Sequence, residues 1–309
     1  MSTNKFGRES GIRNTIAEFV NRYFTAIMLG PALVAIFVVF IYPVLYLIWQ
    51  SLFRTTLATG GYVQEFVFLD NFRYVLTRGR FVDNLKNSLY YSFGSLTISV
   101  CGGLLLALAV NHVKREWLRT SYSTLLLISW ASPLVVSALI WRWMFNADLG
   151  LINMILTDLG FSEILWLADP TWAMISVTFV DGWVRTPFAM IVFLAGLQAI
   201  PQHMYDAAKM DGATSFQAFR NVTIPYLLPS FAIVILINWM FSFRAFGVIW
   251  GLTQGGPGNS THVLATWIYR DGIVNFNLGT GSATSVILVL ITLAVAAFVV
   301  TKIMVNVEE

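Results

Sequence analysis

Charged residues are scarce in this chain of 309 residues: they make up 11% of the sequence, and hydrophobic residues make up 57%. A soluble domain contains about a quarter charged residues. A chain with so few cannot cover a water-facing surface, which predicts that lipid is its main solvent. The net charge is only +3. Its basic residues lie at the ends of apolar segments instead of in a stripe, and this argues against a nucleic-acid partner.

The residues that carry most enzyme chemistry are also sparse. The single cysteine, Cys101, excludes an intramolecular disulfide. The three histidines, His112, His203 and His262, have no metal-ligand spacing. The chain has no Ser-His-Asp pattern, no Gly-x-Ser-x-Gly and no Gly-rich phosphate loop. We therefore expect no enzymatic activity and no cofactor bound by this chain. Met1 to Asn21 lacks a cleavable apolar core, so we expect no signal peptide.

Long apolar runs are abundant. A helix needs about 20 apolar residues to cross the hydrocarbon core of a membrane. Six runs qualify, and they predict an all-α polytopic membrane protein with six transmembrane helices: Thr25–Phe53, Ser88–Val110, Tyr122–Met144, Thr171–Leu197, Leu228–Ile249 and Gly281–Val305.

The distribution of lysine and arginine predicts the orientation of these spans. With a cytoplasmic N-terminus, the inner connections contain more basic residues than the outer ones. The outer connection Asn146–Pro170 has four acidic residues and no basic one. We expect both termini to be cytoplasmic. The expected parts are an amphipathic segment over residues 1–24, a six-helix transmembrane domain over 25–305 and a tail over 306–309.

Two outer connections, Asn71–Lys86 and Leu149–Leu159, have apolar residues at helical spacing. This pattern predicts short helices at the membrane interface. The N-terminal segment Ile12–Phe24 is similarly amphipathic.

The most hydrophilic inner connection begins "YDAAKMDGATSFQAF" at Tyr205. Its residues predict two short helices around a bend. Pro201 would open the first helix, and Gly212 would end it in a left-handed conformation. Thr214 or Ser215 would cap the second helix, and Pro225 and Pro229 would end it and start the next span. A hairpin that merely rests on the bundle explains this pattern, and so does a loop that docks into a partner.

The segment "YDAAKMDGATSFQAFRNVTIPYLLP" resembles the EAA loop of permease subunits in binding-protein-dependent ABC importers. Asp211, Gly212, Ala213, Phe219 and Pro225 match the pattern of the family, and Asp206 stands where glutamate is usual. "AGLQAIP" from Ala195, "LTQGGPGNSTHVLATWIYRDG" from Leu252, and Tyr42-Pro43 resemble the maltose-type branch, which handles carbohydrates.

The resemblance implies a permease domain in a bacterial inner membrane, a set of partners and transport driven by ATP hydrolysis. It implies that this chain pairs with a second permease, most often a paralogue, and that an external binding protein delivers the solute. It also implies that the cytoplasmic loop, about residues 201–229, docks on one of two ATPase subunits, which use ATP and Mg. The coupling residues would be Asp206, Ala207, Ala208, Asp211, Gly212 and Ala213.

Asp181 and Arg185 are charged residues within the fourth span. They are four residues apart, so they lie on one helix face within reach of each other. A charge at the centre of a bilayer costs about 2.5–3.5 kcal/mol on insertion scales and by default marks a functional site. Two interpretations of this pair stay open. It is either an ion pair within the helix that adjusts packing against neighbouring spans, or part of a solute site.

Aligned without gaps to the maltose-type permease, the chain carries the sugar-contacting positions of that family at eight residues. These are Asp181, Val184, Arg185, Phe188, Asn238, Phe241, Ser242 and Ala245. Arg185 stands where the maltose permease has no side chain, and an arginine fork suits an anionic group. Either the solute is anionic, or Asp181 neutralises Arg185 and the solute is neutral.

Further alternatives stay open. A proton-coupled secondary transporter could use Asp181 as its proton carrier, and a membrane-embedded scaffold could use the hydrophilic loop only for docking. The segment Gly255–Asn259 is either a simple glycine-proline turn or part of the surface that receives solute.

Overall fold

A computed structural model describes residues 23–25, 28–58, 61–78 and 80–301. The predicted N-terminal amphipathic segment and the tail lie almost wholly outside these residues. The first elements in chain order are η1 (Phe37–Ile41), α2 (Tyr42–Ser51), β1 (Phe53–Ala58), β2 (Gly61–Phe66), α3 (Asp70–Arg78), α4 (Phe81–Asn111), α5 (Glu116–Ala131), α6 (Leu134–Met144) and α7 (Leu151–Asp158). The remainder are α8 (Pro170–Ala199), α9 (Gln202–Met210), α10 (Ser215–Ala218), η2 (Phe219–Thr223), α11 (Ile224–Phe243), α12 (Gly247–Leu252), α13 (Leu264–Ile268), η3 (Tyr269–Val274) and α14 (Leu278–Val299), where η marks a π-helical segment.

The described residues contain five helices that are long and apolar enough to cross a membrane: Tyr23–Ser51, Phe81–Asn111, Pro170–Ala199, Ser215–Phe243 and Leu278–Val299. A sixth crossing requires α5 and α6 together, and their axes meet at 93°. The predicted third span, Tyr122–Met144, is therefore two helices. Ser132 and Pro133 adopt extended backbone angles between them, because proline lacks an N–H and disfavours a helical residue before it.

Other expectations for the elements need correction. The chain is not purely helical: β1 and β2 form an antiparallel hairpin in which Phe53 pairs with Phe66. The predicted helix over Asn71–Lys86 is divided between α3 and the start of α4. The predicted short helix over Leu149–Leu159 is confirmed as α7.

The prolines after the hydrophilic connection do not end a helix. Ser215–Phe243 is one continuous rod of 29 residues. Pro225 falls in the first turn of α11, directly after the π-helical turn η2. The missing N–H of Pro225 lies where the hydrogen-bond pattern already changes, so the helix continues through it.

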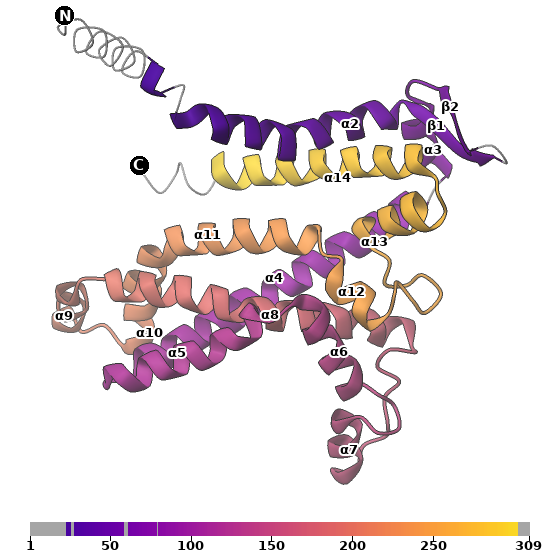
Figure 1. Ribbon diagram of the computed structural model, residues 1–309. Coiled ribbons are helices and arrows are strands. Elements are labelled where there is room, and N and C mark those ends of the chain that lie inside the picture. Colours follow the sequence, from indigo (N-terminus) through magenta and orange to yellow (C-terminus); the bar gives the residue numbers. More distant parts are fainter. Residues whose placement is uncertain (1–22, 26–27, 59–60, 79, 302–309) are drawn as a thin grey trace, which may run out of the picture.

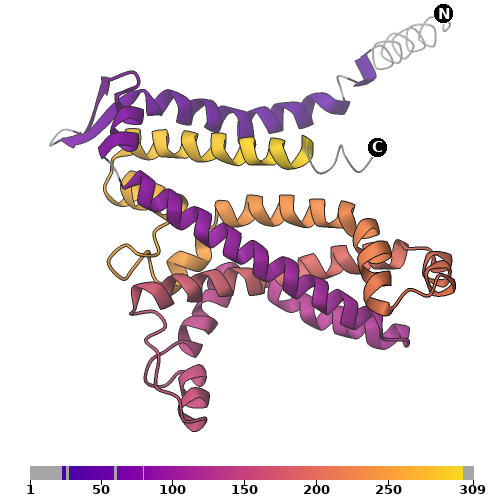
Figure 2. The same ribbon diagram turned by 180° about the vertical axis from the view of Figure 1, so that it is seen from behind.

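The elements divide between two ends of the molecule (Figure 1). The loop of α9 and α10 lies at the same end as the start of α2 and the end of α14. The β-hairpin, α3, α7, α12 and α13 lie at the opposite end, and Figure 2 shows the same division from behind. The start of α2, the end of α14 and the hydrophilic loop therefore share one side of the molecule, and the cytoplasmic location of that side stays a prediction.

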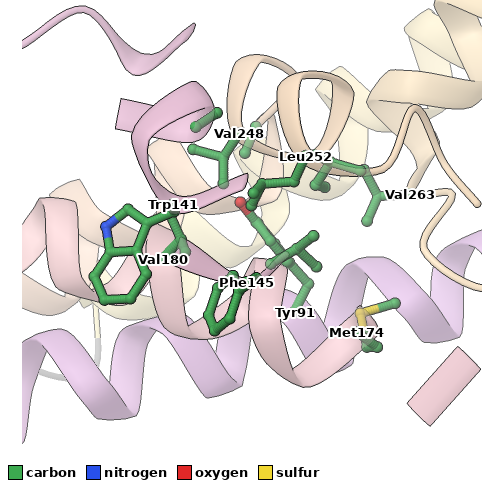
Figure 3. Close-up of a cluster of buried hydrophobic side chains, with 12 residues drawn as sticks. Tyr91, Trp141, Phe145, Met174, Val180, Val248, Leu252 and Val263 are labelled. Carbon is green, nitrogen blue, oxygen red and sulfur yellow. The ribbon is translucent and has the colours of Figure 1, made fainter. Parts of the chain in front are cut away.

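Helices α4, α8 and α11 pack together at the centre of the fold. The buried side of α4 consists mostly of small residues at helical spacing, namely Ser88, Ser92, Ser95, Ser99, Gly103 and Ala107, and small side chains allow close approach of helices in membranes. A cluster that includes Tyr91, Val180 and Val248 joins α4 and α8 to α12 (Figure 3). This core fixes the positions of the polar residues that lie within it.

Candidate functional site: the polar centre and the α9–α10 loop

Asp181 is the hub of a polar cluster inside the helix bundle, which we call the polar centre. It is fully buried, with 0% exposure. Its Oδ2 accepts hydrogen bonds from Ser95 Oγ at 2.6 Å and from Ser242 Oγ at 2.7 Å. Arg185 donates from Nε at 2.8 Å and from Nη2 at 2.9 Å to the two carboxylate oxygens. One carboxylate thereby joins α4, α8 and α11.

A second contact extends the polar centre by one helical turn. Asn238 of α11 donates from Nδ2 to Ser99 Oγ of α4 at 3.0 Å, and both side chains are buried. Ser99 and Ser95 are four residues apart and therefore lie on the same face of α4. The hydrogen bonds satisfy these buried groups, which would otherwise destabilise the fold.

Arg185 reaches from the polar centre toward an exposed aromatic surface. Its guanidinium carbon lies 5.5 Å from the ring centroid of Phe241, and that residue is 52% exposed. A contact of this kind contributes about 0.5–2 kcal/mol. Asp181 occupies Nε and Nη2, and no described residue accepts a hydrogen bond from Nη1. The guanidinium is thus oriented by a carboxylate and retains an unpaired donor atom.

An aromatic pair lies one turn further along α8. Phe188 stacks on Trp130 with ring centroids 6.0 Å apart. Trp130 is 49% exposed and lies beside the break between α5 and α6. Broken helices that line a cavity are typical of solute sites in transporters. Sequence reasoning missed Trp130, although Pro133 was a visible signal for the break.

The eight predicted solute residues fall into three groups. Asp181, Arg185, Asn238 and Ser242 belong to the polar centre, and Phe188 and Phe241 form the aromatic surface beside it. Val184 and Ala245 are buried apolar residues. Ser95 and Ser99 were missed. Contact of any of these residues with solute stays a prediction.

The hydrophilic connection folds as two short helices around a bend, as expected. Pro201 precedes the first residue of α9, and Gly212 has a φ of +76°, a left-handed conformation that costs glycine little. Thr214 caps α10: its Oγ1 accepts from Gln217 N, and Gln217 Oε1 accepts from Thr214 N. This is a capping box.

One face of the α9–α10 loop packs against the helix bundle, and the other face is exposed. Ala208 packs against the apolar cluster between α8 and α11, and Tyr205 Oη lies 3.0 Å from Thr223 Oγ1. Asp206, Ala207, Asp211 and Gly212 are exposed, and Ala213 is half-buried. The small residues therefore present an open surface at the end of the bundle.

The described residues contain no cluster of three or more histidine, cysteine, aspartate or glutamate side chains arranged to hold a metal ion.

Residues 99–307 match the family described as binding-protein-dependent transport system inner membrane component. The chain belongs to this family. The permease is 32% identical over 279 residues to the sulfoquinovosyl glycerol transport system permease protein SmoG of Agrobacterium fabrum, which covers 90% of this chain and 89% of the relative. It is 35% identical over 271 residues to the trehalose/maltose transport system permease protein MalF of Thermococcus litoralis, with 87% and 89% covered.

The sn-glycerol-3-phosphate transport system permease protein UgpA of Agrobacterium fabrum is 32% identical over 283 residues, with 91% of this chain and 94% of the relative covered. The fold of the permease is also similar to a chain in a crystal structure of a bacterial alginate ABC transporter, with a TM-score of 0.79 and 22% identity over 92% of this chain and 96% of that one. The predicted resemblance is confirmed: the protein is an inner membrane permease subunit of a binding-protein-dependent ABC importer of the maltose-type branch.

Proposed function

We propose that this permease imports a sugar or sugar-like solute that carries an anionic group. The observation that carries the proposal is the state of Arg185. Asp181 fixes its orientation through two hydrogen bonds, and Nη1, beside the exposed ring of Phe241, has no hydrogen-bond partner in the part of the chain that the structure describes. A guanidinium donates charge-assisted hydrogen bonds to phosphate, sulfonate or carboxylate.

The aromatic residues of the same region suit the rest of such a solute. Carbohydrate sites combine an apolar wall with a few polar groups that fix orientation. Phe188, Trp130 and Phe241 would supply the wall, and Asn238 and Ser242 would hold the polar face in place. Among the relatives, the name of UgpA includes sn-glycerol-3-phosphate, an anion, and the name of MalF includes neutral trehalose and maltose.

ATP hydrolysis would take place in subunits other than this chain. Two ATPase subunits with bound ATP and Mg would drive transport, a second permease would complete the pore, and an external binding protein would deliver the solute. In this arrangement both termini face the cytoplasm, and the α9–α10 loop docks on an ATPase through its open side, with Asp206, Ala207, Asp211, Gly212 and Ala213. Ala208, also predicted as a coupling residue, packs against the bundle and would hold the loop in place. The exposure of the small residues at the end of the bundle supports this role.

Transport by the complex reconstituted in vesicles tests the mechanism. Uptake is expected to require both ATP and the ATPase subunits. Uptake driven by a proton gradient without them would instead support a secondary transporter that uses Asp181.

The class of solute is tested in two steps. Thermal shifts of the binding protein with sugar phosphates, sulfonated sugars and neutral sugars identify what it binds. Transport is then compared between the wild type and the double variant Asp181→Asn, Arg185→Gln, which keeps hydrogen-bonding groups and removes both charges. Arg244→Gln removes an exposed arginine outside the polar centre and serves as the control. A binding protein that takes only neutral sugars, or equal transport by the double variant and the control, contradicts the proposal.

A further inference from the structure

A second arginine, Arg270, borders a cavity of about 510 Å³ at the end of the molecule opposite the α9–α10 loop. Other residues that line this cavity are Gln254, Gly255, Gly258, Asn259 and His262. The cavity is open to solvent and is separate from the polar centre, none of whose residues lines it.

The loop around the cavity is held by internal hydrogen bonds. Thr253 Oγ1 lies 2.7 Å from Thr261 Oγ1, and Thr261 Oγ1 donates to Gly256 O at 2.8 Å. Asn87 of α4 donates from Nδ2 to the carbonyl oxygens of Ser260 and His262, both at 3.0 Å. The cavity wall is therefore attached to the central helix of the bundle.

Gly255 is part of this wall, and its position requires glycine for two reasons. Its φ of +88° is left-handed, and a side chain at this position would overlap the imidazole ring of His262. Only glycine gives the loop backbone this close approach to the ring.

The hydrogen bonds of His262 show that its imidazole is neutral. Thr266 Oγ1 donates to Val263 O and accepts from Val263 N, so toward His262 Nδ1, 3.1 Å away, it can only accept. The ring proton is therefore on Nδ1, and the free Nε2 accepts from Arg270 Nη1 at 2.9 Å. Burial, followed by the charges of Arg270 and Arg80, lowers the pKa of His262 to about 4, in agreement with this assignment.

Arg270 is thus held without being neutralised. Its Nη1 also donates to Asn259 Oδ1, and both of its partners are uncharged. The ion pairs found among the described residues are Arg54–Glu65 and Arg185–Asp181, and neither includes Arg270. The neighbouring carboxylate of Asp271 instead accepts from Asn277 Nδ2 and Thr280 Oγ1.

We propose that this cavity is a binding site for an oxyanion, such as a phosphate or a carboxylate, with Arg270 as its cationic group. Among the described residues, none accepts a hydrogen bond from Nε or Nη2 of this half-buried guanidinium. These two donors match two oxygens of one anion. The anion would belong either to the solute on its way to the pore or to an acidic side chain of the binding protein. The location of the cavity outside the cell rests on the proposed function.

Chemical modification of Arg270 in the assembled importer tests the site. The complex is treated with p-hydroxyphenylglyoxal, and the reaction at each arginine is followed by peptide mass spectrometry. At an inorganic phosphate concentration of about twice the Kd, modification of Arg270 is expected to slow about threefold, because bound anion excludes the reagent. Arg244 is exposed and lies outside the cavity, so its reaction should not change.

A second arm separates the two sources of the anion. Protection by phosphate alone supports entry of an anionic solute, and additional protection by the unloaded binding protein supports a protein carboxylate. Equal reaction of Arg270 with and without both additions would overturn the proposal. The reaction needs no transport, so it reports on the cavity even if the proposed solute is wrong. A membrane-impermeant reagent applied from each side of the vesicle tests the orientation separately.

Discussion

Arg185 and Arg270 are held in opposite ways in one chain. Arg185 is 7% exposed and is paired through two atoms with a carboxylate that three helices share. Arg270 is half-buried at the molecular end and is braced by an amide oxygen and a neutral imidazole. Inside the bundle a bare charge would be too costly, whereas beside an open cavity water solvates the available donors. The two arginines therefore differ in their partners: Arg185 has a carboxylate partner and keeps Nη1 for a further acceptor, whereas the described partners of Arg270 are uncharged.

The strongest test of this difference removes the carboxylate. Asp181→Ala leaves the guanidinium of Arg185 buried and unpaired, and this should destabilise the permease by about 3–5 kcal/mol. The double variant Asp181→Leu, Arg185→Met replaces both charges by apolar groups and should recover most of that loss. Thermal denaturation of the purified complex measures both.

Arg270→Gln is the matched variant for the other arginine. This variant leaves no buried charge without a partner, so it should lower the stability of the permease far less than Asp181→Ala does. Equal losses of stability in Asp181→Ala and Arg270→Gln would contradict the conclusion that the two arginines differ in how they depend on their partners.

Ser95→Ala removes one of the donors to Asp181 and should cost about 1.5 kcal/mol, the lower end for a hydrogen bond to a charged group, because Ser242 and Arg185 remain. Thr97→Ala on the same helix is the control, since Thr97 is exposed and bonds only to Phe93 O. Thermal denaturation should show a loss for Ser95→Ala alone. An equal loss of stability in Thr97→Ala would show that the loss in Ser95→Ala does not come from the hydrogen bond to Asp181.

Acid should destabilise the loop that contains His262 and Arg270. The pKa of His262 is lowered from 6.5 to about 4 in the folded state, so the unfolded state binds more protons between these values. The stability of the loop is therefore fully present above about pH 6.5. It should fall by up to about 1.4 kcal/mol per pH unit below that.

Trp267 offers a probe of this change, because its ring centroid lies 5.8 Å from that of His262. The difference in fluorescence between the wild type and Trp267→Phe, measured in lipid nanodiscs, should decrease as His262 is protonated. His262→Gln should abolish the pH dependence. A pH dependence that persists in His262→Gln would assign the transition to another group.

The smallest effect is expected at the far end of the molecule, in the loop that contains neither arginine. Thr214→Ala removes the cap of α10 and should cost about 1 kcal/mol. Thr214→Ser retains the hydroxyl and should behave as the wild type. Hydrogen exchange of the amide of Gln217, which donates to Thr214 Oγ1, measures both variants. Unchanged exchange in Thr214→Ala would show that the cap is dispensable.

Apolar run lengths predicted most of the spans, because each crossing must satisfy its own backbone within lipid. They could not predict the 93° bend at Ser132–Pro133. Proline weakens a helix locally, but tertiary packing decides whether the chain kinks, breaks or continues. The same residue type leaves α8 unbroken at Pro187 and α11 unbroken at Pro229.

The pair Asp181–Arg185 was predictable, since residues four apart on a helix face each other. Its partner Ser95 was not, because a stripe of serines on α4 does not reveal which helix it meets. The bond between His262 and Arg270 depends on the loop that brings together two residues eight positions apart. Contacts within one helix follow from spacing, and contacts between elements follow from packing.

The continuity of Ser215–Phe243 has a mechanical consequence. At about 1.5 Å per residue, this rod of 29 residues is roughly 40 Å long. One end carries Thr214 and the bend at Gly212, and the other carries Ser242, which is bonded to Asp181. A tilt of about 5° at the loop would move the far end by about 4 Å, more than a hydrogen bond can tolerate. A movement of the α9–α10 loop would therefore break the hydrogen bond between Ser242 and Asp181.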